Sequence, residues 1–206
     1  MDIIDIYNRE LPTIKESISN SKQRISNIDI IKYSLTDFTD NKKKAGTVNE
    51  LLTAGTLSKL GYEVYVPNDN NRDYDIIISK DGKKGYLECK LDNSAHIYNN
   101  FYFEYWNYTF NRPTGINNSN LNTLYAHTYF NNADKRYYFL SGKRIVFVEA
   151  IKTILSKEPN SIRKYEHTYI SHNGLVGDSA YIVKQDTFMK YFKGFNIPLL
   201  PVYRWK

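Results

Sequence analysis

The chain has 206 residues, of which 41% are hydrophobic and 15% aromatic, and its formal net charge is +6. This length and apolar content suit one globular domain, residues 1–206, and the basic balance favours polyanionic partners over acidic ones. A single cysteine excludes an intramolecular disulfide. With no signal peptide and no apolar run of about 18 residues, we expect a soluble cytoplasmic protein without a membrane partner.

The N-terminal part of the chain, residues 1–40, is polar with isoleucines at helical spacing, which predicts a mainly helical segment. A polar loop is expected at 40–46, and it holds three consecutive lysines, Lys42, Lys43 and Lys44. A lysine run is usually a solvated surface, and the alternative is a contact with DNA phosphates.

A helix is predicted over 47–60, because Gly61 is a good residue to end it. Glu50 lies off the most apolar face of this helix. It is either a solvent-facing glutamate or a residue that orients water or a metal ion. The first strand is expected at 62–66.

A β-hairpin is predicted around Asp81 and Gly82, because an Asp-Gly pair between β-rich runs suits the turns that require positive φ. A symmetric loop at this pair places Asp75 directly opposite Glu88 and directs Lys90 to the same face. Opposed residues have Cβ atoms roughly 4.5–5.5 Å apart, so two carboxylates there need a cation or a proton between them.

A hard divalent cation such as Mg²⁺ is the simpler answer, with Mn²⁺ as a possible substitute, because Mg²⁺ takes one or two carboxylates together with waters and phosphate oxygens. The backbone carbonyl of Cys89 is a further expected ligand, since a strand carbonyl beside an acid can face the ion. The alternative is a surface hairpin with an ordinary ion pair between Asp73 and Lys90.

An acid at the start of one strand, followed by Glu88-Cys89-Lys90 on the next, resembles the PD-(D/E)XK nuclease superfamily, over about residues 45–130. Three further segments resemble a phage-type subgroup of that superfamily: Lys90-Leu91-Asp92, Asn100-Phe101-Tyr102-Phe103-Glu104 and Pro113-Thr114-Gly115-Ile116. The chain departs from the family in two places. No proline immediately precedes Asp75, so either Asp73 or Asp75 is the acidic ligand, and Asn122 stands where the subgroup has an aspartate.

The resemblance implies an α/β fold with a central mixed sheet flanked by helices, as in restriction endonucleases. It also implies a magnesium-dependent deoxyribonuclease in which Asp75 and Glu88 bind the metal and Lys90 activates water. Glu50 matches the glutamate that the family often adds from the preceding helix.

The rest of the chain predicts a strand over 101–106, whose Glu104 either reaches the metal region or pairs with a cation. The C-terminal part, residues 131–206, is expected to hold strands and a helix. The individual expectations are strands at 121–130, 137–140, 144–148 and 180–183, a short helix from 151, a loop at 174–178 and a helix that Asp186 caps.

DNA is the expected partner, and DNA processing or degradation of the phage type is the first of three expected activities. The others are site-specific restriction and Holliday junction resolution, for which a homodimer would pair two sites about a two-fold axis. A different class of function is a DNA-binding or inhibitory protein that keeps the nuclease fold without cleaving.

Overall fold

The computed structural model describes residues 42–67, 74–118, 120, 122–172 and 174–199. The helical part predicted for 1–40 lies outside these residues, and so does Asp73. Within the described ranges, no helix has both the length and the apolar character needed to cross a membrane.

The described chain is a mixed α/β structure. Its helices are α3 (Lys42–Lys59), α4 (Ala95–Tyr98), α5 (Arg144–Lys157) and α6 (Gln185–Tyr191), with 3₁₀ turns η3 (Gly115–Asn117) and η4 (Pro159–Ser161). Its strands are β1 (Glu63–Tyr65), β2 (Ile76–Lys80), β3 (Lys83–Asp92), β4 (Asn100–Asn107), β5 (Arg112–Pro113), β6 (Leu124–Asn131), β7 (Arg136–Lys143), β8 (Ile162–Ser171), β9 (Gly174–Lys184) and β10 (Phe195–Pro198).

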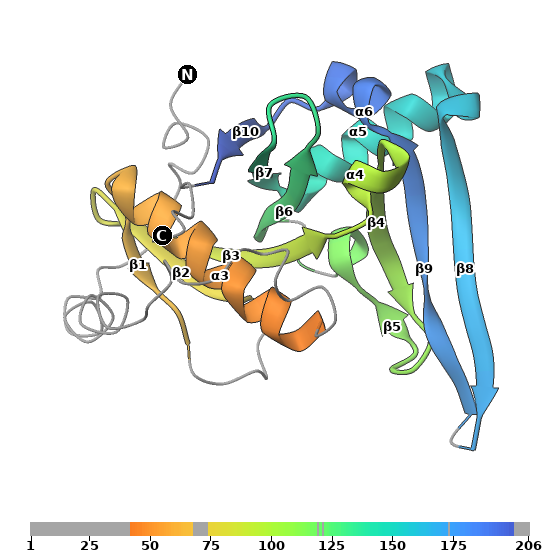
Figure 1. Cartoon of the computed structure of the whole chain (residues 1–206). Helices are drawn as coiled ribbons and strands as arrows, with labels where there is room; N and C mark the ends of the chain where they lie inside the picture. The colour runs from red at the N-terminus through yellow and green to blue at the C-terminus, as the bar shows by residue number, and fades with distance from the viewer. Residues whose placement is uncertain (1–41, 68–73, 119, 121, 173, 200–206) are drawn as a thin grey trace, which may run out of the picture.

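The central sheet has six strands in the order β1-β2-β3-β6-β7-β10. Its neighbouring strands are antiparallel except for β3 and β6, which are parallel, so the sheet is mixed. Helix α3 packs on one face through a core that includes Leu52, Leu57, Leu87 and Ala126 (Figure 1). The prediction of a central mixed sheet flanked by helices is therefore confirmed.

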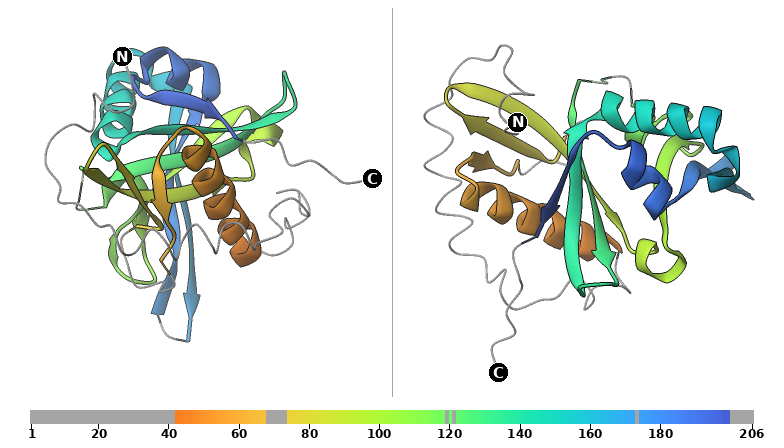
Figure 2. Two further views of the ribbon diagram at one scale, coloured as in Figure 1. Left: turned by 90° about the vertical axis from the view of Figure 1, so that its left-hand side faces the viewer. Right: turned by 90° about the horizontal axis from the view of Figure 1, so that it is seen from above.

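The second sheet has four strands in the order β5-β4-β9-β8. Together with α5 and α6 it covers the other face of the central sheet, through an aromatic core that includes Phe101, Phe103, Tyr125, Phe147 and Phe188 (Figure 2). The hairpin of β8 and β9 extends beyond the rest of this sheet as a long two-stranded arm (Figure 1).

The predicted hairpin register is confirmed from Ile76 to the turn, and Asp75 lies outside the paired residues. Strands β2 and β3 pair Ile76 with Leu87 and Lys80 with Lys83, as a symmetric Asp81-Gly82 loop requires. Asp81 has a φ of 50° and Gly82 a φ of 76°, so both turn residues adopt the left-handed conformation that led to the prediction.

Three local predictions are wrong. Residues 42–46 belong to α3 and not to a loop, and residues 144–148 open α5 and are not a strand. Residues 174–178 belong to β9, because they pair with the end of β8. Gly177 serves that pairing: its φ is 137°, and a Cβ there would collide with the carbonyl oxygen of His167.

The last helix, α6, lies where it was predicted, but Lys184 occupies its N-cap and Asp186 sits inside the first turn. An acid in the first turn still favours the helix through the macrodipole.

Candidate active site

Asp75 stands at the point where β2 and β3 separate. Its backbone N–H donates to the carbonyl of Leu87 at 2.8 Å, and its carboxylate Oδ2 accepts the N–H of Cys89 at 2.7 Å. Beyond Leu87, β3 continues beside β6 on its other edge, so the Asp75 side chain takes the position of a missing strand partner. This contact fixes the carboxylate against β3.

The backbone of Cys89 is directed toward Asp75. Residues two apart along a strand point their N–H and C=O groups to the same edge, and Leu87 and Cys89 both bond to Asp75. The Cys89 carbonyl therefore faces the Asp75 side of β3, as the sequence predicted. Its thiol is buried in the core under α3, and burial, followed by the negative charges of Asp75 and Glu50, raises the pKa of that thiol.

Glu88 lies on the opposite face of β3 from the Cys89 thiol and is held by two cations. Its Oε2 accepts the guanidinium of Arg144, which is fully buried, and its Oε1 lies 3.4 Å from Nζ of Lys90. Lys90 is also 4.0 Å from Oε2 of Glu104 on β4. A carboxylate can accept several hydrogen bonds at once, so the Glu88 contacts leave it acceptor capacity.

Glu50 is brought to this group by α3. It is half-buried, and its pKa is raised to about 7, first by burial and then by the negative charge of Asp75, while Lys90 opposes the rise. Burial also raises the pKa of Asp75, against the Cys89 hydrogen bond and the charges of Lys90 and Arg144. The charges of Asp75 and Lys90 both act on Glu50, so the three groups influence one another electrostatically.

This group contains four carboxylates, those of Glu50, Asp75, Glu88 and Glu104. They outnumber its two cations, Lys90 and Arg144. Among the described residues, no three side chains of His, Cys, Asp or Glu are arranged as a metal cage. The site nevertheless contains carboxylates and a strand carbonyl, and such hard oxygen donors suit an ion that keeps several waters.

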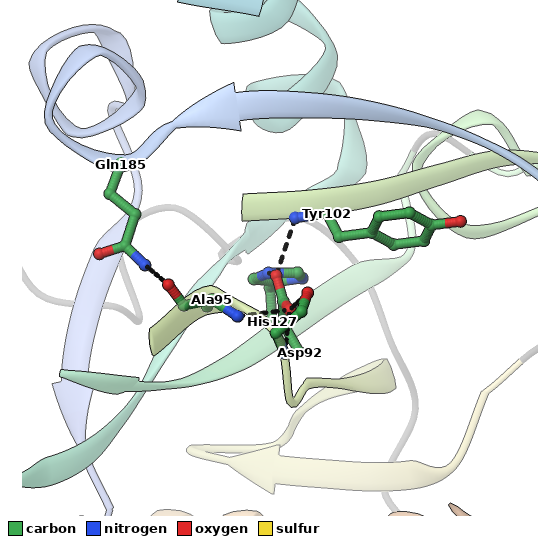
Figure 3. Close-up of polar contacts among 6 residues, drawn as sticks. Asp92, Ala95, Tyr102, His127 and Gln185 are labelled. Carbon is green, nitrogen blue, oxygen red and sulfur yellow. Dashed lines mark hydrogen bonds and ion pairs between the residues drawn. The ribbon is translucent and has the colours of Figure 1, made fainter. Parts of the chain in front are cut away.

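Asp92, two residues after Lys90, is a buried structural residue. Its Oδ1 accepts Ser94 and the N–H of Ala95, and its Oδ2 accepts the N–H of Tyr102 at 2.7 Å and lies 3.3 Å from Nε2 of His127. Figure 3 shows the carboxylate among Ala95 of α4, Tyr102 of β4 and His127 of β6. Asp92 thus ties the end of β3 to the second sheet.

Replacing this carboxylate is expected to weaken the fold. Burial by itself would raise the pKa of Asp92, but the hydrogen bond and charge of His127, together with Ser94 and Tyr102, lower it. Asp92→Asn replaces the carboxylate with a neutral amide, which cannot accept all of these hydrogen bonds. The free energy of unfolding is therefore expected to fall by about 2–4 kcal/mol. Urea denaturation followed by circular dichroism measures the change.

The control is Glu149→Gln, at an exposed position of α5 outside its first turn, which is expected to cost less than about 0.5 kcal/mol. Because the folded pKa of Asp92 is lowered, its stabilisation is present at neutral pH and is lost as the pH falls below its ordinary value of 3.8. The difference between wild type and Asp92→Asn should therefore shrink in acid, and a constant difference would contradict the assignment.

The three predicted lysines, Lys42, Lys43 and Lys44, form the first turn of α3, the helix that carries Glu50. His127 is structural, because it is buried against Asp92. Glu104 pairs with a cation, Lys90, and so also borders the predicted site.

Arg144 is the functional candidate that the sequence interpretation missed. It begins α5, and its second guanidinium nitrogen donates to the carbonyl of Asn120 at 2.9 Å. The available signal was helical spacing: Arg144 opens the buried series that continues with Phe147, Ile151 and Ile154. An arginine on the apolar face of a helix points to a buried partner carboxylate.

Comparisons with known proteins add little to this site. No family model matches the chain, and no curated protein does. Among solved structures, a bacterial homing endonuclease matches over 78% of this chain and 79% of that one, with 11% identity and a TM-score of 0.29. A superposition this loose supports no inference about fold or activity, so the function must be inferred from the residues of the site.

Proposed function

We propose that this chain is a metal-dependent DNA endonuclease that hydrolyses phosphodiester bonds, with a site of the PD-(D/E)XK kind. One observation carries the proposal. The Asp75 carboxylate is hydrogen-bonded to the backbone of Cys89, the residue between Glu88 and Lys90, and the charges of Asp75 and Lys90 both act on Glu50 of α3. Burial destabilises the ionised forms of both Glu50 and Asp75, and the charge of Asp75 adds to the effect on Glu50. Such perturbed groups gather at functional sites.

The residues fit Mg²⁺, or Mn²⁺ in its place. Asp75, Glu88 and the Cys89 carbonyl would hold the ion, and Glu50 would bind a water or a second ion. Four carboxylates against two cations leave a formal charge of about −2 when all are ionised, which a divalent cation offsets. When bound, the ion would polarise the phosphate and lower the pKa of a water molecule.

Lys90 would act on both the phosphate and the attacking water. Its ammonium stands between Glu88 and Glu104, partly exposed, where a phosphate could approach. There it would stabilise the negative charge that develops on an attacked phosphate and orient the attacking water. Glu50, when ionised, would accept a proton from that water.

DNA is the proposed substrate because the chain carries a net charge of +6 and phosphate contacts supply most of the affinity for DNA. The helix that carries Glu50 is also proposed to contact the DNA phosphate backbone, through Lys42, Lys43 and Lys44. DNA processing or degradation remains the first expectation, before site-specific restriction and junction resolution, and the last two would suit a homodimer.

The test is incubation of the pure protein with supercoiled, linear, single-stranded and four-way junction DNA, with Mg²⁺ or with EDTA. We expect cleavage that requires the metal and that falls at least about 100-fold in Lys90→Ala. The matched control is Lys152→Ala, which removes an exposed lysine from α5. Cleavage that persists in EDTA, or that Lys90→Ala leaves intact, would overturn the proposal.

The ion pair between Glu88 and Arg144 supports a second candidate, a DNA-binding or inhibitory protein that does not cleave. Arg144 competes with a metal ion for the Glu88 carboxylate, and a lasting pair would keep the ion out. This candidate predicts that the wild-type protein retains DNA in gel-shift assays but leaves every substrate intact with Mg²⁺ and with Mn²⁺.

Cation binding is expected to depend on pH through Glu50. Because its pKa is about 7 in the metal-free protein, Glu50 is protonated in mild acid and must lose a proton when a cation binds. The raised pKa of Asp75 acts in the same direction. Calorimetric titration with Mn²⁺ should therefore show affinity that rises from about pH 5.5 to about pH 7 and then levels off.

Glu50→Gln is expected to weaken Mn²⁺ binding above pH 7 and to flatten this pH dependence. Glu149→Gln, at an exposed position of α5, serves as the control and should reproduce the wild-type profile. An unchanged pH profile of Mn²⁺ affinity in Glu50→Gln would show that Glu50 takes no part in cation binding.

A further inference from the structure

The outer face of the second sheet carries aromatic and basic side chains. Strand β9 pairs Ile182 with Tyr102 of β4 on one side and with Arg163 of β8 on the other. In the same way, Ala180 lies between Glu104 and Tyr165. Directly paired residues share a face of a sheet, so these six side chains form one surface that faces away from the aromatic core.

A surface pocket of about 310 Å³ opens on this face. It is lined by Tyr98, Tyr102, Arg163, Tyr165 and Ile182, among others. The volume is at the lower end of the range for small-ligand sites and suits a single planar group. Three tyrosine rings and a guanidinium combine stacking surfaces with a positive charge, which is the chemistry that binds a nucleobase and its phosphate.

The rings of this pocket are held in place. The Tyr102 hydroxyl donates to Oδ2 of Asp178 at 2.5 Å, and its ring meets that of Tyr165 edge-on at 6.1 Å. Figure 3 shows the Tyr102 ring directed away from Asp92 and His127, toward the outer side of β4. Tyr98 and Tyr165 remain exposed, with 69% and 39% of their surfaces accessible. The pocket therefore has one fixed wall and two accessible rings.

The pocket adjoins the candidate active site. Glu104, which lies 4.0 Å from Lys90, is two residues from Tyr102 on the same face of β4, a spacing of about 7 Å along a strand. After burial and the Asp178 hydrogen bond, the charge of Glu104 also contributes to raising the pKa of Tyr102. One DNA strand whose phosphate contacts Lys90 could therefore place a neighbouring base in the pocket.

We propose that this pocket binds an unpaired base of the DNA strand that is cleaved. The proposal rests on the proposed function and narrows its substrate. The flat face of a base becomes accessible to side chains only when the base leaves the duplex stack. Single-stranded or branched DNA, or a duplex from which a base is extruded, is then the substrate class, and Arg163 neutralises the adjacent phosphate.

The test measures binding of a fluorescein-labelled oligothymidine to the full chain by anisotropy in EDTA, where no metal-dependent cleavage occurs. Tyr165→Ala is expected to raise the Kd about 5- to 100-fold, the range for loss of one base–aromatic stack, while Tyr165→Phe binds as the wild type does. Arg163→Ala is expected to raise the Kd severalfold and to reduce its dependence on salt.

Two controls share β8 with these variants. Tyr169→Ala removes an exposed tyrosine four residues from Tyr165, beyond the pocket, and Lys164→Ala removes a charge from the opposite face of the strand. Both are expected to change the Kd less than twofold. If Tyr169→Ala weakened oligothymidine binding as much as Tyr165→Ala, or if Tyr165→Ala bound with wild-type affinity, the proposed role of the pocket would be overturned.

A second readout reports stacking directly. 2-Aminopurine within a single strand should be quenched by the wild-type protein and not by Tyr165→Ala, whose fold is checked by its melting temperature. Cleavage of supercoiled, single-stranded and four-way junction DNA with Mg²⁺, measured in parallel, separates the two proposals. Cleavage with no effect of Tyr165→Ala on binding or quenching rejects the pocket alone, whereas pocket-dependent binding without any wild-type cleavage rejects the nuclease function alone.

Discussion

Asp75→Asn is expected to reduce metal-dependent DNA cleavage by about 10³-fold or more while leaving the fold intact. The amide keeps the size of the side chain, and its oxygen can still accept the N–H of Cys89, so the junction of β2 and β3 should persist. What is lost is the negative charge at the centre of the proposed metal site, and a neutral amide is a weaker ligand for a hard divalent cation. The measurement is the initial rate of plasmid cleavage at saturating Mg²⁺, with circular dichroism to verify folding.

Glu149→Gln provides the control, because it also neutralises one acid but lies exposed on α5. A substantial cleavage rate in folded Asp75→Asn would show that Asp75 is not a metal ligand. Because Asp73 precedes it by two residues, Asp73→Asn tests the alternative left open by the sequence.

Arg144→Met is expected to lower the free energy of unfolding by about 3–5 kcal/mol. Arg144 is fully buried, and the Glu88 side chain beside it is only 12% exposed. Removing the guanidinium leaves Glu88 with only the more exposed Lys90 as a cationic partner and deprives the Asn120 carbonyl of its donor. Breaking one side of a buried pair costs this much because the remaining charge stays desolvated.

A double-mutant cycle with Glu88→Gln separates the ion pair from other effects of Arg144. If the penalty comes from the unpaired charge, Glu88→Gln combined with Arg144→Met should be at least about 1–2 kcal/mol more stable than the sum of the single changes predicts. Urea unfolding of the four proteins gives these values. Simple additivity would mean that Arg144 acts through packing and not through Glu88.

Local sequence was sufficient to predict the hairpin and the residues that it brings together. The Asp81-Gly82 turn requires positive φ at both positions, and the two-residue alternation of a strand then fixes which side chains face one another. No distant contact is needed for either step. This is why Asp75, Glu88 and Lys90 could be proposed as one site from the sequence.

Two segments were misjudged because local preference and tertiary contact disagree. The run Ile145, Val146 and Val148 has high strand propensity, but burial of Phe147 and Ile151 against the second sheet selects a helix. Strand β8 was not predicted, because nearly all of its side chains are exposed and it lacks the apolar alternation by which strands are usually detected.

The sequence by itself determined the central hairpin, the helix before it, the mixed α/β class and the residues of the proposed metal site. Only the tertiary structure put Glu50 of α3 under the electrostatic influence of Asp75, buried Arg144 against Glu88 and placed Glu104 beside Lys90. These contacts join residues up to 56 positions apart. Turn geometry and strand alternation act between near neighbours, whereas such pairs form only when helices and sheets pack, which is a property of the whole core.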